Sequence, residues 1–143
     1  MSAELLRQSA ILARQYHVRL HTHLCETKDE ENFMLAREGV RPLEYMARLG
    51  WLGDDVWFAH GIHFNDEELR LLAQTGTGVA HCPISNMKLA SGVARIPEML
   101  ALCAGRTGGG RQRQQRRLKP AGGTAGSLLA APAARQPSGS HRL

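Results

Sequence analysis

Three short apolar runs in this sequence end at or next to a histidine, and a helical pattern follows each run. The runs cover residues 18–24, 56–60 and 78–81, with His23, His60 and His81 at their ends. They lack regular polar alternation, which predicts strands buried on both faces in a parallel sheet. Repeated β/α units are typical of a (β/α)8 barrel, in which polar residues at the carboxyl ends of the strands converge on one mouth. Three separate core histidines, each with its own partner, are the alternative.

The segments between these runs carry helix signals. We expect helices over about residues 2–16, 27–38, 42–49 and 65–75, and a short one from Pro97. Ser2 and Asn65 are suitable N-caps, Pro42 suits a first helical turn, and Gly39 and Gly76 suit helix ends. The predicted apolar stripe of the first helix consists of Leu5, Leu6, Ser9, Ile11, Leu12 and Tyr16. Pro83 ends the third strand, and we interpret residues 84–92 as an ordered loop.

The composition of the chain changes near residue 104. Residues 1–98 contain all 13 acidic residues and 10 basic ones, so their net charge is −3. Residues 99–143 contain the other 8 basic residues and no acid, so their net charge is +8. Residues 104–143 have no aromatic side chain and are rich in Gly, Arg, Ala, Gln, Ser and Pro, so they cannot bury enough surface to offset their ordering entropy. We therefore expect a folded domain at 1–103. The low-complexity basic tail at 104–143 would be disordered or translated in a shifted frame.

The basic tail offers an alternative function. Clustered arginines between residues 106 and 119 attract phosphate, which would suit a non-catalytic chain that binds nucleic acid. No aromatic side chain is interleaved to stack on bases, so we prefer incidental charge and expect no nucleic-acid partner. No apolar run approaches the ~18 residues of a membrane span. The 3 cysteines form no CxxC pair. We expect a cytoplasmic chain with reduced thiols and no membrane partner.

The first run places two histidines and an acid close together. His21 and His23 share one face of a strand, and Glu26 follows where the chain leaves it. Neutral imidazoles with a nearby carboxylate suit a metal ion and a proton carrier. From the residues alone, both histidines are candidate ligands.

Three ordered motifs point to a known family. They are His23-Leu-Cys-Glu26, Ala59-His60-Gly-Ile-His63 and His81-Cys-Pro-Ile-Ser-Asn86. This set resembles the metal-dependent amidohydrolase superfamily, in its branch of cytosine, guanine and chlorotriazine-type deaminases, over about residues 2–100. The resemblance implies an α/β fold: a partial (β/α)8 barrel of about strands five to seven with their helices. It also implies one divalent metal ion, zinc or iron, and hydrolytic deamination of a purine-type heterocycle such as 8-oxoguanine.

The resemblance also assigns expected roles to matching positions. His23 would be a metal ligand, and Glu26 would carry a proton between water and a ring nitrogen of the substrate. His60 would orient or polarise the attacking oxygen. His81, Ser85 and Asn86 would bind substrate or shape the mouth. His21 would be structural or would bond a partner.

The resemblance further implies ligands that this sequence does not contain. A His-x-His motif would lie upstream of Met1, and an aspartate would follow soon after residue 104, where no acid occurs. Only His23 of four expected ligands is then present. A single ligand is too few to hold catalytic zinc, so we expect neither binding of the catalytic metal nor turnover by this chain alone. A partial barrel with open edge strands would also need a complementary barrel fragment or would self-associate.

Overall fold

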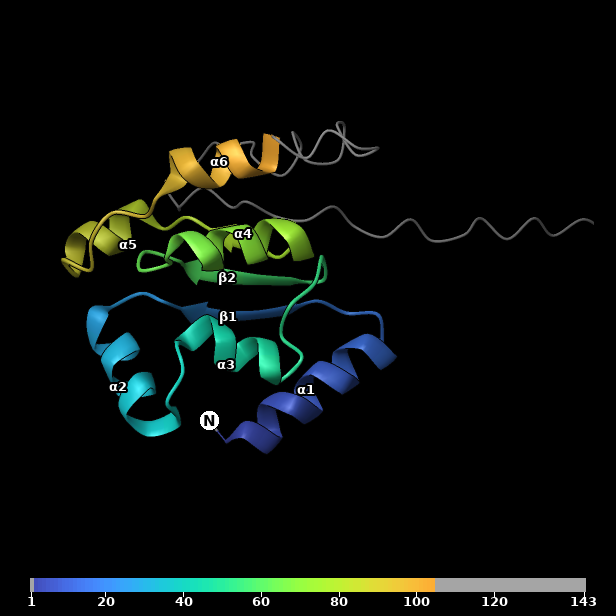
Figure 1. Ribbon diagram of the computed structural model, residues 1–143. Coiled ribbons are helices and arrows are strands. Elements are labelled where there is room, and N and C mark those ends of the chain that lie inside the picture. Colours follow the sequence, from blue (N-terminus) through green and yellow to red (C-terminus); the bar gives the residue numbers. More distant parts are fainter. Residues whose placement is uncertain (1, 105–143) are drawn as a thin grey trace, which may run out of the picture.

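The computed structural model describes residues 2–104, and the basic tail predicted at 104–143 lies outside that part except for its first residue. Helices and strands alternate along the chain (Figure 1). Their order is α1 (Ala3–Gln15), β1 (Leu20–Leu24), α2 (Lys28–Glu38), α3 (Pro42–Arg48), β2 (Val56–His60), α4 (Asp66–Thr75), β3 (Gly78–Ala80), α5 (Pro83–Lys88) and α6 (Ile96–Ala104).

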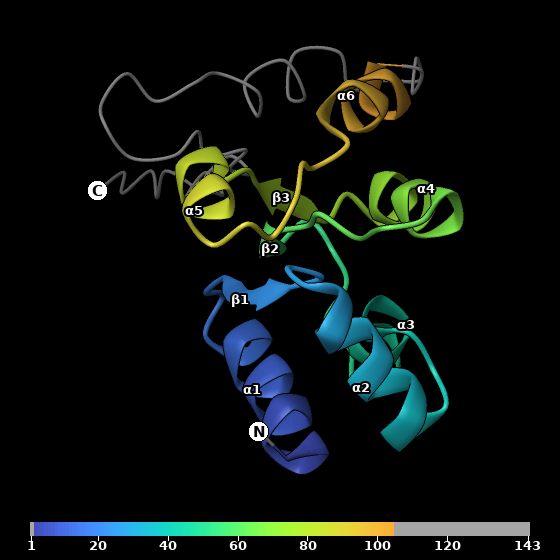
Figure 2. The ribbon, with the colours of Figure 1, turned by 90° about the vertical axis from the view of Figure 1, so that its left-hand side faces the viewer.

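The three strands form a parallel sheet in the order β1-β2-β3. Leu20 is in register with Val56 and Leu24 with His60, so β1 and β2 end at the same edge. Both connections between the strands pass through helices, as parallel strands require. Figures 1 and 2 show α1, α2 and α3 gathered on the side of β1, with α4 and α6 beyond β2 and β3. The predicted β/α units are therefore confirmed for the described residues.

Local signals define most helix ends. The Ser2 hydroxyl accepts a hydrogen bond from the Leu5 N–H at 3.3 Å. Asn65 and Glu68 form a reciprocal capping box, in which each side chain accepts from the other's backbone N–H at 2.8 Å. Gly39 and Gly76 close α2 and α4 with φ values of 70° and 76°, where a residue with a Cβ would be strained. These predicted ends are confirmed.

The core lies between the helices and the sheet. Phe58 and Leu43 are fully buried, and Val56 is 1% exposed. Trp51 is also buried, and its indole N–H donates to the Leu6 carbonyl at 2.8 Å, which ties α1 to the turn after α3. No helix in the described part of the chain is both long and apolar enough to cross a membrane.

The predicted loop at 84–92 is partly wrong, because residues 83–88 form helix α5. Pro83 occupies the first helical turn, where its missing N–H costs nothing. Helix α5 has only 6 residues, which is too short a run for a helical period to be recognised in the sequence.

Two predicted burial patterns are also wrong. Helix α1 buries Leu6, Ala10 and Ala13, while Leu5 and Ile11 of the predicted stripe are exposed. Small alanines allow the close approach of α1 to its neighbours, and an apolarity pattern gives them little weight. Strand β1 is not buried on both faces either, because its burial alternates and both of its histidines are exposed.

Candidate functional site

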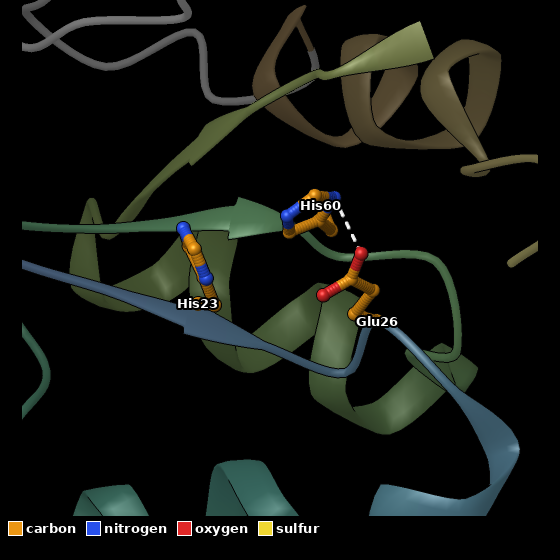
Figure 3. A group of neighbouring side chains, drawn as sticks. All are labelled: His23, Glu26 and His60. Carbon is orange, nitrogen blue, oxygen red and sulfur yellow. Dashed lines mark ion pairs between the residues drawn. The ribbon is translucent and has the colours of Figure 1, made fainter. Parts of the chain in front are cut away.

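His23, Glu26 and His60 converge at the carboxyl ends of β1 and β2. One nitrogen or oxygen atom from each side chain lies within 4.8 Å of the other two (Figure 3). His23 comes from β1, Glu26 from the loop that follows it, and His60 from the last position of β2. The parallel register of these strands brings the three residues to one edge of the sheet.

His60 is the buried member of this group, at 5% exposure. Its Nδ1 lies 2.7 Å from Oδ1 of Asn86 and 3.5 Å from Oε1 of Glu26. Its ring meets the His23 ring edge-on, with centroids 5.0 Å apart. The backbone of His60 has a φ of 72°, which is uncommon for a residue with a side chain and turns the chain out of the strand here.

Main-chain hydrogen bonds join the loops that carry the group. The Cys25 carbonyl accepts from the N–H groups of Ile62 and His63 at 2.9 and 3.0 Å. The Glu26 N–H donates to a carboxylate oxygen of Glu30 at 2.9 Å, so the first turn of α2 holds Glu26 in place. The segment after β1 and the segment after β2 therefore form one connected platform.

Arg41 connects these loops to helices α2 and α4. Its guanidinium pairs with Glu31 of α2 and with Glu68 of α4, the latter at 2.9 Å, and it donates to the His63 carbonyl at 2.8 Å. Both carboxylates are buried, and their bonds to Arg41 raise the pKa of the guanidinium further. Sequence reasoning gave Arg41 no role, although the capping-box spacing from Asn65 to Glu68 was a visible signal for one of its partners.

The remaining predicted site residues lie on the segment after β3. Asn86 contacts the group through His60, as described above. His81 and Ser85 are half-buried and form no side-chain hydrogen bond to His23, Glu26 or His60 in the part of the chain described. Burial lowers the pKa of the His81 imidazole. The structure thus brings four of the six predicted site residues into contact and leaves two beside them.

Three neighbouring residues are not part of the group. The His21 ring stacks on Trp57 instead. His63 directs Nε2 toward the Ser91 carbonyl at 3.2 Å. Burial raises the pKa of the Cys25 thiol, which disfavours the thiolate that a nucleophile requires.

The chemistry of the converging side chains fits a divalent cation. Two imidazoles and a carboxylate are donors that zinc and iron accept, and catalytic zinc is commonly held by three protein ligands and a water molecule. The group is open on the His23 side, because that residue is exposed, and closed on the His60 side. It can therefore combine a cation with a solvent-shielded imidazole and a carboxylate that is partly exposed.

Comparison with known proteins gives matches over most of the described residues. The amidohydrolase family model matches residues 1–102. The 8-oxoguanine deaminase of Pseudomonas aeruginosa is 54% identical over 101 residues, which are 71% of this chain and 22% of that protein. The 5'-deoxyadenosine deaminase of Methanopyrus kandleri is 46% identical over 99 residues, 69% of this chain and 23% of that protein.

Solved structures give the same picture. An adenosine deaminase from Xanthomonas campestris with bound zinc superimposes with a TM-score of 0.70 at 32% identity, covering 71% of this chain and 23% of the other. An atrazine chlorohydrolase from Arthrobacter aurescens TC1 complexed with zinc superimposes with a TM-score of 0.68 at 32% identity. The match covers 71% of this chain and 22% of that one. The chain thus spans about a fifth of the length of the relatives that it matches.

Proposed function

This chain belongs to the amidohydrolase family, and from that premise we propose that it is part of a metal-dependent aminohydrolase acting on a purine-type heterocycle such as 8-oxoguanine. The observation that carries the proposal is the convergence of His23, Glu26 and His60 within 4.8 Å at one edge of a parallel sheet. The 54% identity to the Pseudomonas aeruginosa enzyme supports this substrate class over that of the adenosine-type deaminases.

We assign His23 as a ligand of the metal ion, zinc or iron, because its exposed ring faces the open side of the group. When bound, such an ion lowers the pKa of a coordinated water molecule to about 7. The zinc in two structural neighbours supports this assignment. The other ligands would come from parts of a complete barrel that residues 2–104 do not include.

Glu26 would act as the proton carrier. A carboxylate beside the group can take a proton from water as the oxygen attacks the ring carbon that bears the amino group, and deliver it to the adjacent ring nitrogen. The remaining proton of the attacking oxygen then passes to the amino group, the C–N bond breaks, and ammonia leaves as the ring carbon becomes a carbonyl. His60 would hold the attacking oxygen in line, because its buried ring cannot move away.

We further propose that β1, β2 and β3 correspond to barrel strands five, six and seven. His81, Ser85 and Asn86 would then lie at the mouth after strand seven, where barrel enzymes bind substrate. Within the described residues β1 and β3 are the edge strands, and α1 and α5 expose apolar side chains such as Ile11 and Met87. These features support a need for a complementary barrel fragment or for self-association. A monomer that melts sharply and cooperatively by calorimetry would contradict this part.

A chimera tests the activity. Residues 2–102 of this chain would replace the matching segment of the Pseudomonas aeruginosa 8-oxoguanine deaminase, which is similar over 101 residues. We expect the chimera to release ammonia from 8-oxoguanine in a Zn²⁺- or Fe²⁺-dependent reaction. Its rate of release from 8-oxoguanine should exceed its rates from guanine and 5'-deoxyadenosine. The 143-residue chain alone is expected to release none, and turnover by it would contradict the proposed division of the site.

Two matched substitutions in the chimera separate chemistry from folding. Glu26→Gln should lower kcat by about 10²-fold or more, because the proton carrier is removed. Glu44→Gln is the control, since Glu44 lies exposed on α3 in a surface ion pair with Arg48. A folded chimera without deaminase activity, or full activity in Glu26→Gln, would refute the proposed function.

A further inference from the structure

We propose that Asn86 is a positioning residue that fixes the tautomer of His60, with the proton on Nδ1 and the lone pair on Nε2. The inference deepens the proposed function, because it says which nitrogen of His60 faces the reacting atoms. It starts from the contact of 2.7 Å between His60 Nδ1 and Asn86 Oδ1.

Two acceptors face the same nitrogen of His60. Asn86 presents its side-chain oxygen at 2.7 Å, and Glu26 presents Oε1 at 3.5 Å. An ionised carboxylate can only accept a hydrogen bond. A lone pair on Nδ1 would therefore point at two oxygen atoms, whereas a proton on Nδ1 satisfies the nearer one. If the Asn86 amide were turned so that its NH2 group faced Nδ1, a lone pair on Nδ1 would still point at Oε1 of Glu26.

The contact is also shielded and rigid. Asn86 is 2% exposed and His60 is 5% exposed, so water cannot easily replace either partner. The backbone of Asn86 is held on both sides, because its N–H donates to the Cys82 carbonyl and its carbonyl accepts from the Ser91 N–H, both at 3.0 Å. Burial makes the hydrogen bond costly to break, since an unpaired buried donor loses its hydration.

This tautomer has two consequences for the site. In a neutral imidazole with its proton on Nδ1, Nε2 is an acceptor. Figure 3 shows the second ring nitrogen of His60 on the side of the ring that faces His23. There it can accept a hydrogen bond from the attacking water. Because Asn86 Oδ1 lies closer to Nδ1 than Glu26 Oε1 does, 2.7 Å against 3.5 Å, the Nδ1 proton is directed at Asn86, and the Glu26 carboxylate keeps its oxygen atoms available to move a proton.

The tautomer can be read directly by nitrogen NMR. The full 143-residue chain would be labelled with ¹⁵N, and its histidine ring signals recorded at about pH 8, where an ordinary imidazole is neutral. His60→Gln identifies the His60 signals by their loss. We expect two-bond couplings of the Nδ1–H form for His60, whereas the freely exposed His17 should show the Nε2–H form that imidazole side chains prefer in water. A predominantly Nε2–H signal for His60, in whatever state the chain adopts, overturns the inference.

Three further chains test the role of Asn86 as an acceptor, all in a Glu26→Ala background that removes the competing oxygen. With Asn86 present, the Nδ1–H form should persist. Asn86→Leu should shift His60 toward Nε2–H, and Asn86→Asp, which also presents an oxygen, should restore Nδ1–H. An Nδ1–H signal that survives Asn86→Leu would refute the role of Asn86. The NMR measurement uses neither substrate nor metal, so it is independent of the activity assay. An inactive chimera together with an Nδ1–H signal for His60 would refute the proposed function but not this inference.

Discussion

The imidazole ring of His21 lies stacked on the indole of Trp57, with centroids 4.9 Å apart and planes at 14°. Its Nδ1 is also 3.2 Å from the Trp57 carbonyl oxygen. His23 lies on the same strand face, and its ring centroid is 6.1 Å from that of His21. The register partner of His23 is Ala59, whereas that of His21 is Trp57. The small alanine leaves the His23 ring free to meet His60. The two histidines that look equivalent in sequence therefore have different neighbours.

This difference predicts unequal effects on zinc binding. In the chimera with the Pseudomonas aeruginosa 8-oxoguanine deaminase, His23→Ala should weaken Zn²⁺ binding at least about tenfold, because loss of a ligand costs no less than loss of a residue that supports one. His21→Ala should leave the affinity within about twofold. Competition with a chromophoric chelator measures both dissociation constants. Equal losses in the two variants would show that the stacked histidine also binds the metal.

Arg41 is expected to be a major source of stability. Its side chain is 24% exposed and pairs with Glu31 and Glu68, whose side chains are 9% and 8% exposed. Arg41→Met should lower the free energy of unfolding by about 3–5 kcal/mol, because two buried carboxylates lose their partner. Arg48→Met, which breaks an exposed pair, should cost less than about 1 kcal/mol. Urea unfolding of both variants measures the difference, and similar costs would contradict a buried network.

Acid should weaken the fold through Glu31. The hydrogen bond from Lys28, followed by the charge of Arg41, holds the pKa of the Glu31 carboxyl below its ordinary value of 4.5. The unfolded chain then binds the proton more readily, so this stabilisation is complete above the ordinary pKa and is lost as pH falls through the lower folded value. Glu31→Gln should therefore be destabilising at neutral pH and approach the wild type in acid.

Urea unfolding between about pH 7 and pH 3 tests the pH dependence, since both states of the carboxyl are sampled in that range. Glu67→Gln is a suitable control, because Glu67 lies exposed in the first turn of α4. Its pH profile should run parallel to that of the wild type. A Glu31→Gln profile that also runs parallel would disprove the contribution of Glu31.

Two glycines in similar conformations should respond differently to alanine. Gly39 and Gly61 have φ values of 70° and 58°, so a Cβ costs roughly 1–2 kcal/mol at either site. At Gly61 the Cβ would lie 2.7 Å from Phe64 Cε2 and 2.9 Å from Val79 Cγ1, whereas at Gly39 no atom lies within 4 Å. Gly61→Ala should cost a further 1–3 kcal/mol or so. Thermal and urea unfolding compare the two, and equal losses would mean that the loop beside His60 relaxes freely.

Elements with strong local signals were predictable to within a residue or two. The strand Val56–His60 and the helix Asp66–Thr75 match their predictions, because Asn65, Gly76 and a run of strand-forming residues act over a few positions. Helix α5 was missed because its 6 residues are too few to show a helical period. The buried face of α1 was misjudged because its alanines pack against neighbours that are distant in sequence.

The candidate site was also predictable only in part. His23, Glu26 and His60 were identified by ordered motifs, and their order after successive strands implied a common edge. The partners of each side chain were not implied. Asn86 lies 26 residues from His60, and Arg41 lies 27 residues from Glu68, so nothing in their local sequence links them.

The sequence by itself determined where the capped helices α1, α2 and α4 begin and where α2 and α4 end, because capping bonds and left-handed glycines act within one turn of the chain. It also determined the family, through motifs that stand in order. Only the tertiary structure decided that His23 meets His60 while His21 stacks on Trp57. That choice depends on which residue of β2 stands opposite each position of β1. These parallel strands are joined by a long crossover through α2 and α3 and not by a tight turn, so no short segment of sequence fixes their register.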